Sequence, residues 1–226
     1  MASAPDIVRL CVKSIENNVD NLIVLDKKNY TQWVSLPSYI IDRLECGEMS
    51  LAHFSDIVRF YLLFVYGGVW LDATCFLSRR IPQDILHKDF WSINGAYKNN
   101  YGWKWTSFVM IGKAGNIVSK QMLSFYYEYW KVHHHAITYL FLDCWLTVLY
   151  ERNKRIMDII NSLPDSGYKV FFLISNLNRE YVPELEDKIR NTFFVYKLTY
   201  KEPFYIEANE KLSLYGYLLR SNGILH

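Results

Sequence analysis

Three charged residues lie within one largely apolar stretch, LAHFSDIVRFYLLFVYGGVWLDATCFL, which begins at Leu51. Asp56 and Arg59 fall in a predicted helix over residues 51–65, and Asp72 ends the short apolar segment that follows. Charges against apolar surface cost free energy unless a partner or a ligand compensates them. Since carboxylates suit hydroxyl groups and a guanidinium suits phosphate oxygens, these residues are candidates for holding the hydroxyls and the phosphate of a ligand.

The spacing leaves two interpretations of the helical pair open. Residues three apart share a helix face, so Asp56 and Arg59 point the same way. They either form an ion pair on a solvated surface, as many such pairs do, or face a ligand. Gly67 and Gly68 end the helix and permit a sharp turn, which would bring the helix face and Asp72 to one crevice.

Helical and strand-like segments alternate along the rest of the chain. Helices are predicted where apolar residues recur every three or four positions, and strands where short runs are continuously apolar. This alternation is typical of an α/β fold with a mostly parallel central sheet flanked by helices, in which ligands bind at the carboxyl ends of strands. The predicted helices cover 5–15, 30–34, 38–44, 51–65, 117–133 and 137–152, and the predicted strands cover 21–26, 69–71, 90–95, 107–112, 169–174 and 192–198.

Composition restricts the classes of protein that fit. The chain has 226 residues, 51% of them hydrophobic, which suits one sizeable core and a single domain over 1–226. A net charge of +2 argues against nucleic acid as a partner. Four cysteines without a CxxC pair indicate reduced thiols in a cytoplasmic protein. No apolar run reaches the ~18 residues of a membrane span, while an aromatic content of 17% suits sugar stacking or contact with a membrane surface.

The segment SLAHFSDIVRFYLLFVYGGVWLDATCFLSRRIP resembles the signature of the capsular polysaccharide synthesis proteins, a branch of the sugar transferases with an Asp-x-Asp motif. Looser similarity extends from APDIVRLCVKSI to YKLTYK. The resemblance implies a GT-A-like nucleotide-sugar-binding fold and a glycosyltransferase that moves a hexose from a nucleotide sugar to a growing capsular or cell-surface polysaccharide, with retention of configuration favoured. It also implies a lipid-linked glycan acceptor and a cytoplasmic enzyme in peripheral contact with the inner face of the cell membrane.

The resemblance also implies roles for individual positions. Residues that match Asp56 and Arg59 help hold the donor sugar and its diphosphate, the residue that matches Asp72 faces the ribose and a divalent cation (Mn or Mg), and an acidic residue near Asp143 lies beside the acceptor. Asp143 is otherwise interpreted as a buried, hydrogen-bonded carboxylate. Together with the residue chemistry, the resemblance predicts Asp72 and Asp143 as catalytic residues, Asp56, Arg59, Gly67, Gly68, Trp70 and Lys201 as donor-binding residues, and Asp72 and Thr74 as metal ligands.

Two features depart from the family pattern. The third motif position is Thr74, and a neutral hydroxyl is a poor ligand for Mn or Mg. Family members usually open with a strand that carries a tryptophan, whereas this chain opens MASAPDIV, so we expect either that the first strand is absent or truncated or that a different segment supplies it. These departures motivate an alternative function, a non-catalytic sugar-nucleotide-binding or assembly subunit of a polysaccharide synthesis complex.

Three further groups of residues each have two interpretations. The histidines at 133–135 are interpreted as a polar break between helices rather than a metal site, because three consecutive side chains cannot face one ion. Lys197 and Lys201 follow an apolar strand and either reach a diphosphate or remain solvated. Trp103 and Trp105 either form a platform for sugar or pack in the core.

Overall fold

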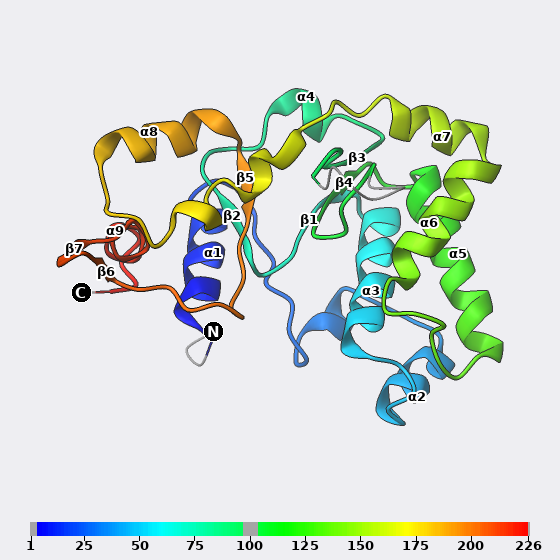
Figure 1. Cartoon of the computed structure of the whole chain (residues 1–226). Coiled ribbons are helices and arrows are strands. Elements are labelled where there is room, and N and C mark those ends of the chain that lie inside the picture. Colours follow the sequence, from blue (N-terminus) through cyan, green and yellow to red (C-terminus); the bar gives the residue numbers. More distant parts are fainter. Residues whose placement is uncertain (1–3, 97–103, 226) are drawn as a thin grey trace.

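A computed structural model describes residues 4–96 and 104–225 as a mixed α/β structure (Figure 1). Its helices are α1 Asp6–Glu16, α2 Ser38–Glu45, α3 Leu51–Val65, α4 Gln83–Leu86, α5 Ile117–Val132, α6 Phe141–Arg152, α7 Lys154–Asn161, α8 Pro183–Thr192 and α9 Leu214–Ser221, with short 3₁₀ turns η1 Tyr30–Gln32, η2 Gly167–Phe171 and η3 Ile174–Asn176. Its strands are β1 Gly68–Leu71, β2 Cys75–Leu77, β3 Phe90–Ser92, β4 Val109–Gly112, β5 Val195–Lys197, β6 Glu207–Ala208 and β7 Lys211–Leu212.

The prediction of a mostly parallel central sheet is wrong for the strands that the structure describes. They form a three-stranded sheet in the order β1-β4-β3 and two pairs, β2-β5 and β6-β7, and all these pairings are antiparallel. The error has a physical reason, because continuous apolar runs report burial of both strand faces and not strand direction. Every residue of β2, β3 and β4 is buried although their partners run antiparallel.

Two of the predicted strands do not form. Residues 21–26 belong to no strand, and the apolar side chains of Leu22, Ile23 and Val24 are exposed. Residues 169–174 lie across η2 and η3, where Val170 and Leu173 are buried at a helical spacing. A short apolar run does not distinguish a strand from a helical turn by itself.

The segment from α3 to β1 folds as its sequence predicts. The Ser50 hydroxyl caps α3 by accepting a hydrogen bond from the backbone N–H of His53. Gly67 and Gly68 then adopt φ values of 70° and 95°, which side chains rarely allow. A Cβ atom on Gly67 would also lie 2.6 Å from the backbone nitrogen of Ala114, so both the turn and the close approach of the backbone at the end of β4 require glycine.

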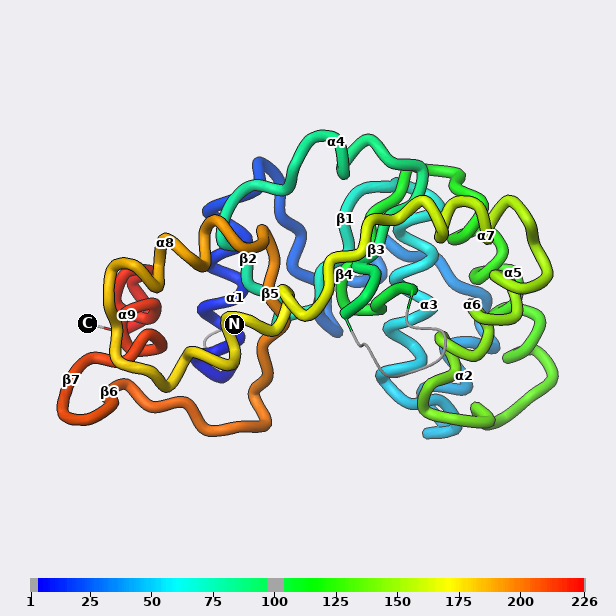
Figure 2. Tube along the Cα trace, turned by 45° about the horizontal axis from the view of Figure 1, so that its top comes forward, coloured from blue at the N-terminus to red at the C-terminus, as the bar shows by residue number. Residues whose placement is uncertain are grey.

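The helices gather into two halves, which Figures 1 and 2 place on opposite sides of the molecule. The helical half contains α2, α3, α5, α6 and α7 around a core that includes Phe60, Tyr126 and Trp130. The terminal half contains α1, α8, α9 and the β2-β5 pair, and its core includes Leu10 and Tyr196. A third apolar cluster joins β2 and β5 of the terminal half to β3 and β4 of the central sheet.

Among the described residues, no helix has both the length and the apolar character required to cross a bilayer.

Candidate functional site

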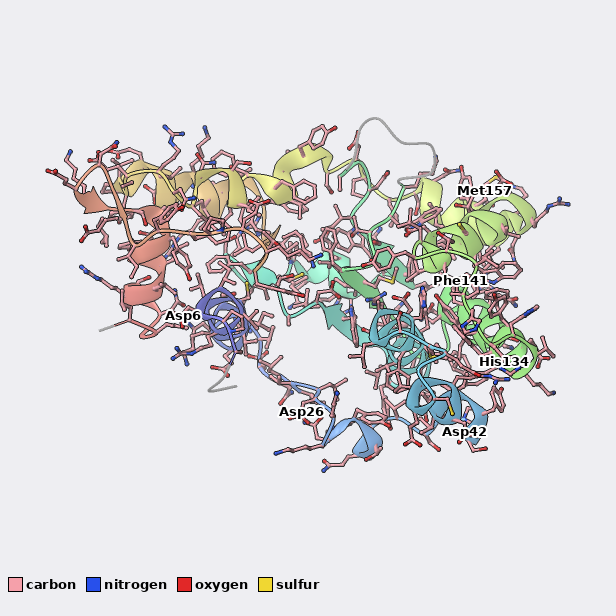
Figure 3. The ribbon with its side chains drawn as sticks, turned by 60° about the horizontal axis from the view of Figure 1, so that its bottom comes forward. Asp6, Asp26, Asp42, His134, Phe141 and Met157 are labelled. Atoms are coloured by element: carbon pink, nitrogen blue, oxygen red, sulfur yellow. The ribbon has the colours of Figure 1, made fainter. Side chains whose placement is uncertain are left out.

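A cavity of about 1420 Å³ has walls from both halves of the molecule. Residues of α3, the turn into β1 and the start of α6 line one side, while residues of α1 and the segment after β5 line the other. Residues 18–25, which lie in no helix or strand, also line the cavity, and Figure 3 shows this segment leading from α1 to Asp26. The cavity therefore collects segments that lie far apart in the sequence.

Four charged side chains form a connected cluster in this cavity. Arg59 Nη1 lies 2.6 Å from Asp56 Oδ1, and Arg59 Nη2 lies 3.4 Å from Asp72 Oδ1. Lys197 Nζ lies 3.0 Å from the other carboxylate oxygen of Asp72. The Trp70 indole N–H donates to Asp72 Oδ1 at 3.0 Å. Asp72 is thus the centre of the cluster, with nitrogen atoms at both of its oxygens.

Strand pairing brings Lys197 to Asp72. In the β2-β5 pair, Lys197 lies opposite Cys75, and the backbone N–H of Leu198 donates to the carbonyl of Thr74 at 2.8 Å. The ammonium group of Lys197 also lies 5.0 Å from the centre of the Phe108 ring, a cation–π contact. The lysine is therefore held from two sides at the end of β1.

The two interpretations of the Asp56–Arg59 pair both describe part of the observed geometry. The residues form an ion pair, but their side chains are only 13% and 5% exposed, and both line the cavity instead of a solvated helix face. The guanidinium carbon of Arg59 lies 5.0 Å from the centre of the Trp70 ring. Both terminal nitrogens of Arg59 contact carboxylates, and its Nε is buried without a hydrogen-bond partner among the described residues, so burial of the guanidinium and not a lack of N–H donors restricts its contact with a phosphate.

Burial and charge act differently on the two carboxylates that contact Arg59. Burial opposes ionisation of Asp72, but Lys197 and Arg59 outweigh it, so the pKa of Asp72 lies below its ordinary value. For Asp56, burial outweighs the attraction of Arg59 and raises the pKa. Asp72 therefore stays charged in the cavity more readily than Asp56 does.

Asp143 lies in the first turn of α6 and lines the same cavity. It accepts a hydrogen bond of 3.0 Å from the indole N–H of Trp105, a fully buried core residue. Burial raises the pKa of Asp143, and the bond from Trp105 only partly offsets this effect. The expected hydrogen-bonded carboxylate is thus present, and it also borders the space in which a ligand would lie.

The other predicted site residues also have definite positions. Gly67, Gly68, Trp70, Thr74 and Lys201 all line the cavity. Lys201 is exposed, and no salt bridge of its ammonium occurs within 4–96 and 104–225. Lys197 is not among the donor-binding residues that the sequence predicts. Only the register of β5 against β2 identifies it as the partner of Asp72.

The remaining predictions concern residues outside this cluster. The histidines at 133–135 lie between α5 and α6, which confirms the predicted polar break. His134 contacts Glu48 at 2.9 Å. Trp105 packs in the core, whereas Trp103 lies outside the described residues. The four cysteines are all free thiols.

The residues present do not fit a divalent cation held by the protein. Lys197 and Arg59 already place positive charge beside the two oxygens of Asp72, and a cation bound there would experience like-charge repulsion. Thr74 is neutral and buried, so it supplies no compensating charge. Over the described part of the chain, no three His, Cys, Asp or Glu side chains cluster in a way that could hold a metal ion. The geometry gives no support to the expected metal ligands Asp72 and Thr74.

Comparisons with known proteins place the chain in a family. The family of capsular polysaccharide synthesis proteins matches residues 1–218, so the chain belongs to this family. The chain is also similar to the O-glycosyltransferase PaGT of Phomopsis amygdali, with 32% identity over 88 residues, which are 39% of this chain and 20% of that protein. The chain therefore matches only a small part of that relative. No solved structure matches the chain.

Proposed function

We propose that the protein is a GT-A-type glycosyltransferase that moves a hexose from a nucleotide sugar to a capsular or cell-surface polysaccharide. Membership of the family and the distant similarity to an O-glycosyltransferase support glycosyl transfer as the activity. The observation that carries the proposal is the convergence of Asp56, Arg59, Trp70, Asp72 and Asp143 on one cavity. A cavity of about 1420 Å³ is large enough for a nucleotide sugar together with part of an acceptor.

In the proposed reaction, an acceptor oxygen forms a bond to the anomeric carbon of the sugar while the bond from that carbon to the phosphate oxygen breaks. In the retaining course, the proton of the acceptor hydroxyl passes to the departing phosphate. The protein contributes mainly by positioning the two substrates and by stabilising the charge that develops on the diphosphate. Asp72 and Arg59 would position the donor, and Asp143 would orient the acceptor hydroxyl.

We also propose that the acceptor is linked to a lipid and that the protein contacts the membrane surface where the acceptor is presented. Tyr139 and Leu140, just before α6, are 76% and 45% exposed, and both line the cavity near Asp143. Exposed apolar side chains at the edge of a polar site suit a ligand that has both a sugar and an apolar chain. Comparing turnover with lipid-linked and free glycan acceptors tests this part of the proposal.

The activity is tested by incubating the protein with a panel of nucleotide sugars and measuring the release of free nucleotide. Slow hydrolysis of one donor, and faster release when a glycan acceptor is present, is the expected result. Asp158→Asn provides a matched control for substitutions at Asp72, because Asp158 also pairs with a lysine but lies on α7 outside the cavity. Failure of every nucleotide sugar to bind would contradict the proposal.

A second candidate function is a non-catalytic subunit that binds sugar nucleotides. Thr74 at the motif position and the pairing of both Asp72 oxygens favour it, because neither leaves an evident metal ligand. Binding of a nucleotide sugar without hydrolysis or transfer to any acceptor would support this candidate over the enzyme.

A further inference from the structure

We propose that Lys197 binds the diphosphate of the donor and that this binding needs no divalent cation. The inference rests on the proposed function, because it names the group in the same cavity that would neutralise the leaving phosphate. It also follows from the positive charges of Arg59 and Lys197 beside Asp72, which would repel a metal ion bound there.

The accessible positive charge of the cluster is Lys197. Its side chain is 23% exposed, against 5% for Arg59, whose two terminal nitrogens both face carboxylates. A lysine ammonium has three N–H donors, and Asp72 accepts from Lys197 at one of its own oxygens. Donors therefore remain for the oxygens of a phosphate, which lysine binds as a compact point charge.

The position of Lys197 is set before any ligand arrives. The backbone pairing of β5 with β2 fixes its Cα, while Asp72 and the Phe108 ring fix its ammonium group. A charge that is already oriented stabilises a developing phosphate charge without reorganisation at the moment of reaction. Asp72 is then a positioning residue, since it acts on the phosphate through Lys197 and Arg59.

A second lysine extends the positive wall. Lys201 follows Lys197 along the chain, lines the same cavity and has no salt bridge within the described residues. Asp56 and Asp72 balance Arg59 and Lys197 before the donor binds. Asp143 and Glu202 also line the cavity, so Lys201 would contribute by direct contact of its ammonium with a phosphate and not through an excess of positive charge in the cavity as a whole.

The test measures binding of UDP, GDP, ADP and CDP to the whole protein by calorimetry, once with excess EDTA and once with Mn. We expect at least one nucleoside diphosphate to bind with dissociation constants that agree within about threefold in the two buffers. We also expect Lys197→Met to weaken this binding about tenfold or more in EDTA, as loss of a charged hydrogen bond to phosphate does, and Lys197→Arg to retain most of it. Lys154→Met is the control, because Lys154 also pairs with an aspartate but lies on α7 outside the cavity.

The outcomes separate this inference from the proposed function. Binding that appears only with Mn would overturn the inference and leave the proposed function standing, and so would unchanged binding by a folded Lys197→Met variant. Absence of binding in both buffers would overturn both. The comparison of EDTA with Mn uses the unaltered protein, so it decides the metal question even where the Lys197 variants fold poorly.

Discussion

The helical half and the terminal half contribute different kinds of residue to the cavity. The helical half supplies Asp56 and Arg59 on α3, an ion pair in which both side chains are at most 13% exposed. The terminal half supplies Lys197, whose ammonium is more accessible and which reaches Asp72 across the β2-β5 pair. The difference indicates that Asp56 and Arg59 form a buried ion pair, while Lys197 provides a positive charge that a ligand can contact.

The largest expected effect comes from removing the negative charge of Asp72, which contacts Arg59 of the helical half and Lys197 of the terminal half. Asp72→Asn leaves Lys197 and Arg59 without their shared counter-charge, so donor turnover should fall about 100-fold, as it does when one preorganised electrostatic contact is lost. Measurement of nucleotide release with the preferred donor checks this value. Full activity of Asp72→Asn would show that Asp72 does not take part in donor turnover. The control variant Asp158→Asn should be as active as the unaltered protein.

The stability of the same variant depends on pH in a defined direction. Asp72 has a lowered pKa in the folded protein, so its charge contributes stability that is present above its unfolded pKa and lost as the pH falls through the folded pKa. Asp72→Asn should therefore lower Tm by about 2–4 °C at pH 7, and the difference should shrink on acidification below the ordinary pKa of aspartate. Melting curves at several pH values measure this convergence.

The next largest effect is expected for the buried ion pair between Asp56 and Arg59 on α3. Arg59→Lys keeps the positive charge but cannot contact Asp56 and Asp72 together in the way that a planar guanidinium does. Turnover should fall about tenfold and Tm should fall as well, since a buried carboxylate loses a partner. Arg190→Lys on α8, where Arg190 pairs with Glu186 at an exposed position, is the control for an arginine pair that lies outside the cavity. Unchanged turnover would show that the two carboxylates need only a nearby positive charge.

The sequence predicts the helix and turn from Ser50 to Gly68 well because their signals are local. The cap at Ser50, the apolar spacing of α3 and the stop at Gly67 and Gly68 all act within a few residues, and α3 has the predicted bounds. The contacts of Lys197 are not local, since 125 residues separate it from Asp72. Its role depends on which strands pair and in which register, and short apolar runs encode neither property.

The same limit explains the error in sheet direction and the partial prediction at Asp143. The sequence predicts strands at 107–112 and 192–198, yet nothing in either run specifies an antiparallel partner. For Asp143, the apolar helix around it indicated that the carboxylate needs a partner. Its observed partner, Trp105, comes from a segment 38 residues away, which helical periodicity could not identify.

The smallest expected effect concerns Asp143, where activity and stability should change in opposite directions. Burial raises the pKa of this carboxyl in the folded protein. Folding therefore disfavours the ionised form of Asp143. The free energy of unfolding is highest below the unfolded pKa of Asp143 and decreases as the pH rises through the folded pKa. A neutral replacement should therefore increase stability most at neutral pH. Asp143→Asn keeps an oxygen that can accept from Trp105, so Tm should rise by about 1–3 °C at pH 7 and little at pH values below the ordinary aspartate pKa.

Turnover of Asp143→Asn should fall a few-fold with acceptor present, because an amide orients a hydroxyl less strongly than a carboxylate does. Donor binding should remain, since Asp143 accepts its hydrogen bond from Trp105, whereas the ion pairs of Asp72 are with Arg59 and Lys197. Asp42→Asn on α2 is a control, because Asp42 is exposed and lies outside the cavity. A fall in Tm at neutral pH would mean that the ionised carboxylate stabilises the fold. Asp143 would then be a structural partner of Trp105, and not a residue that destabilises the fold and serves to bind the acceptor.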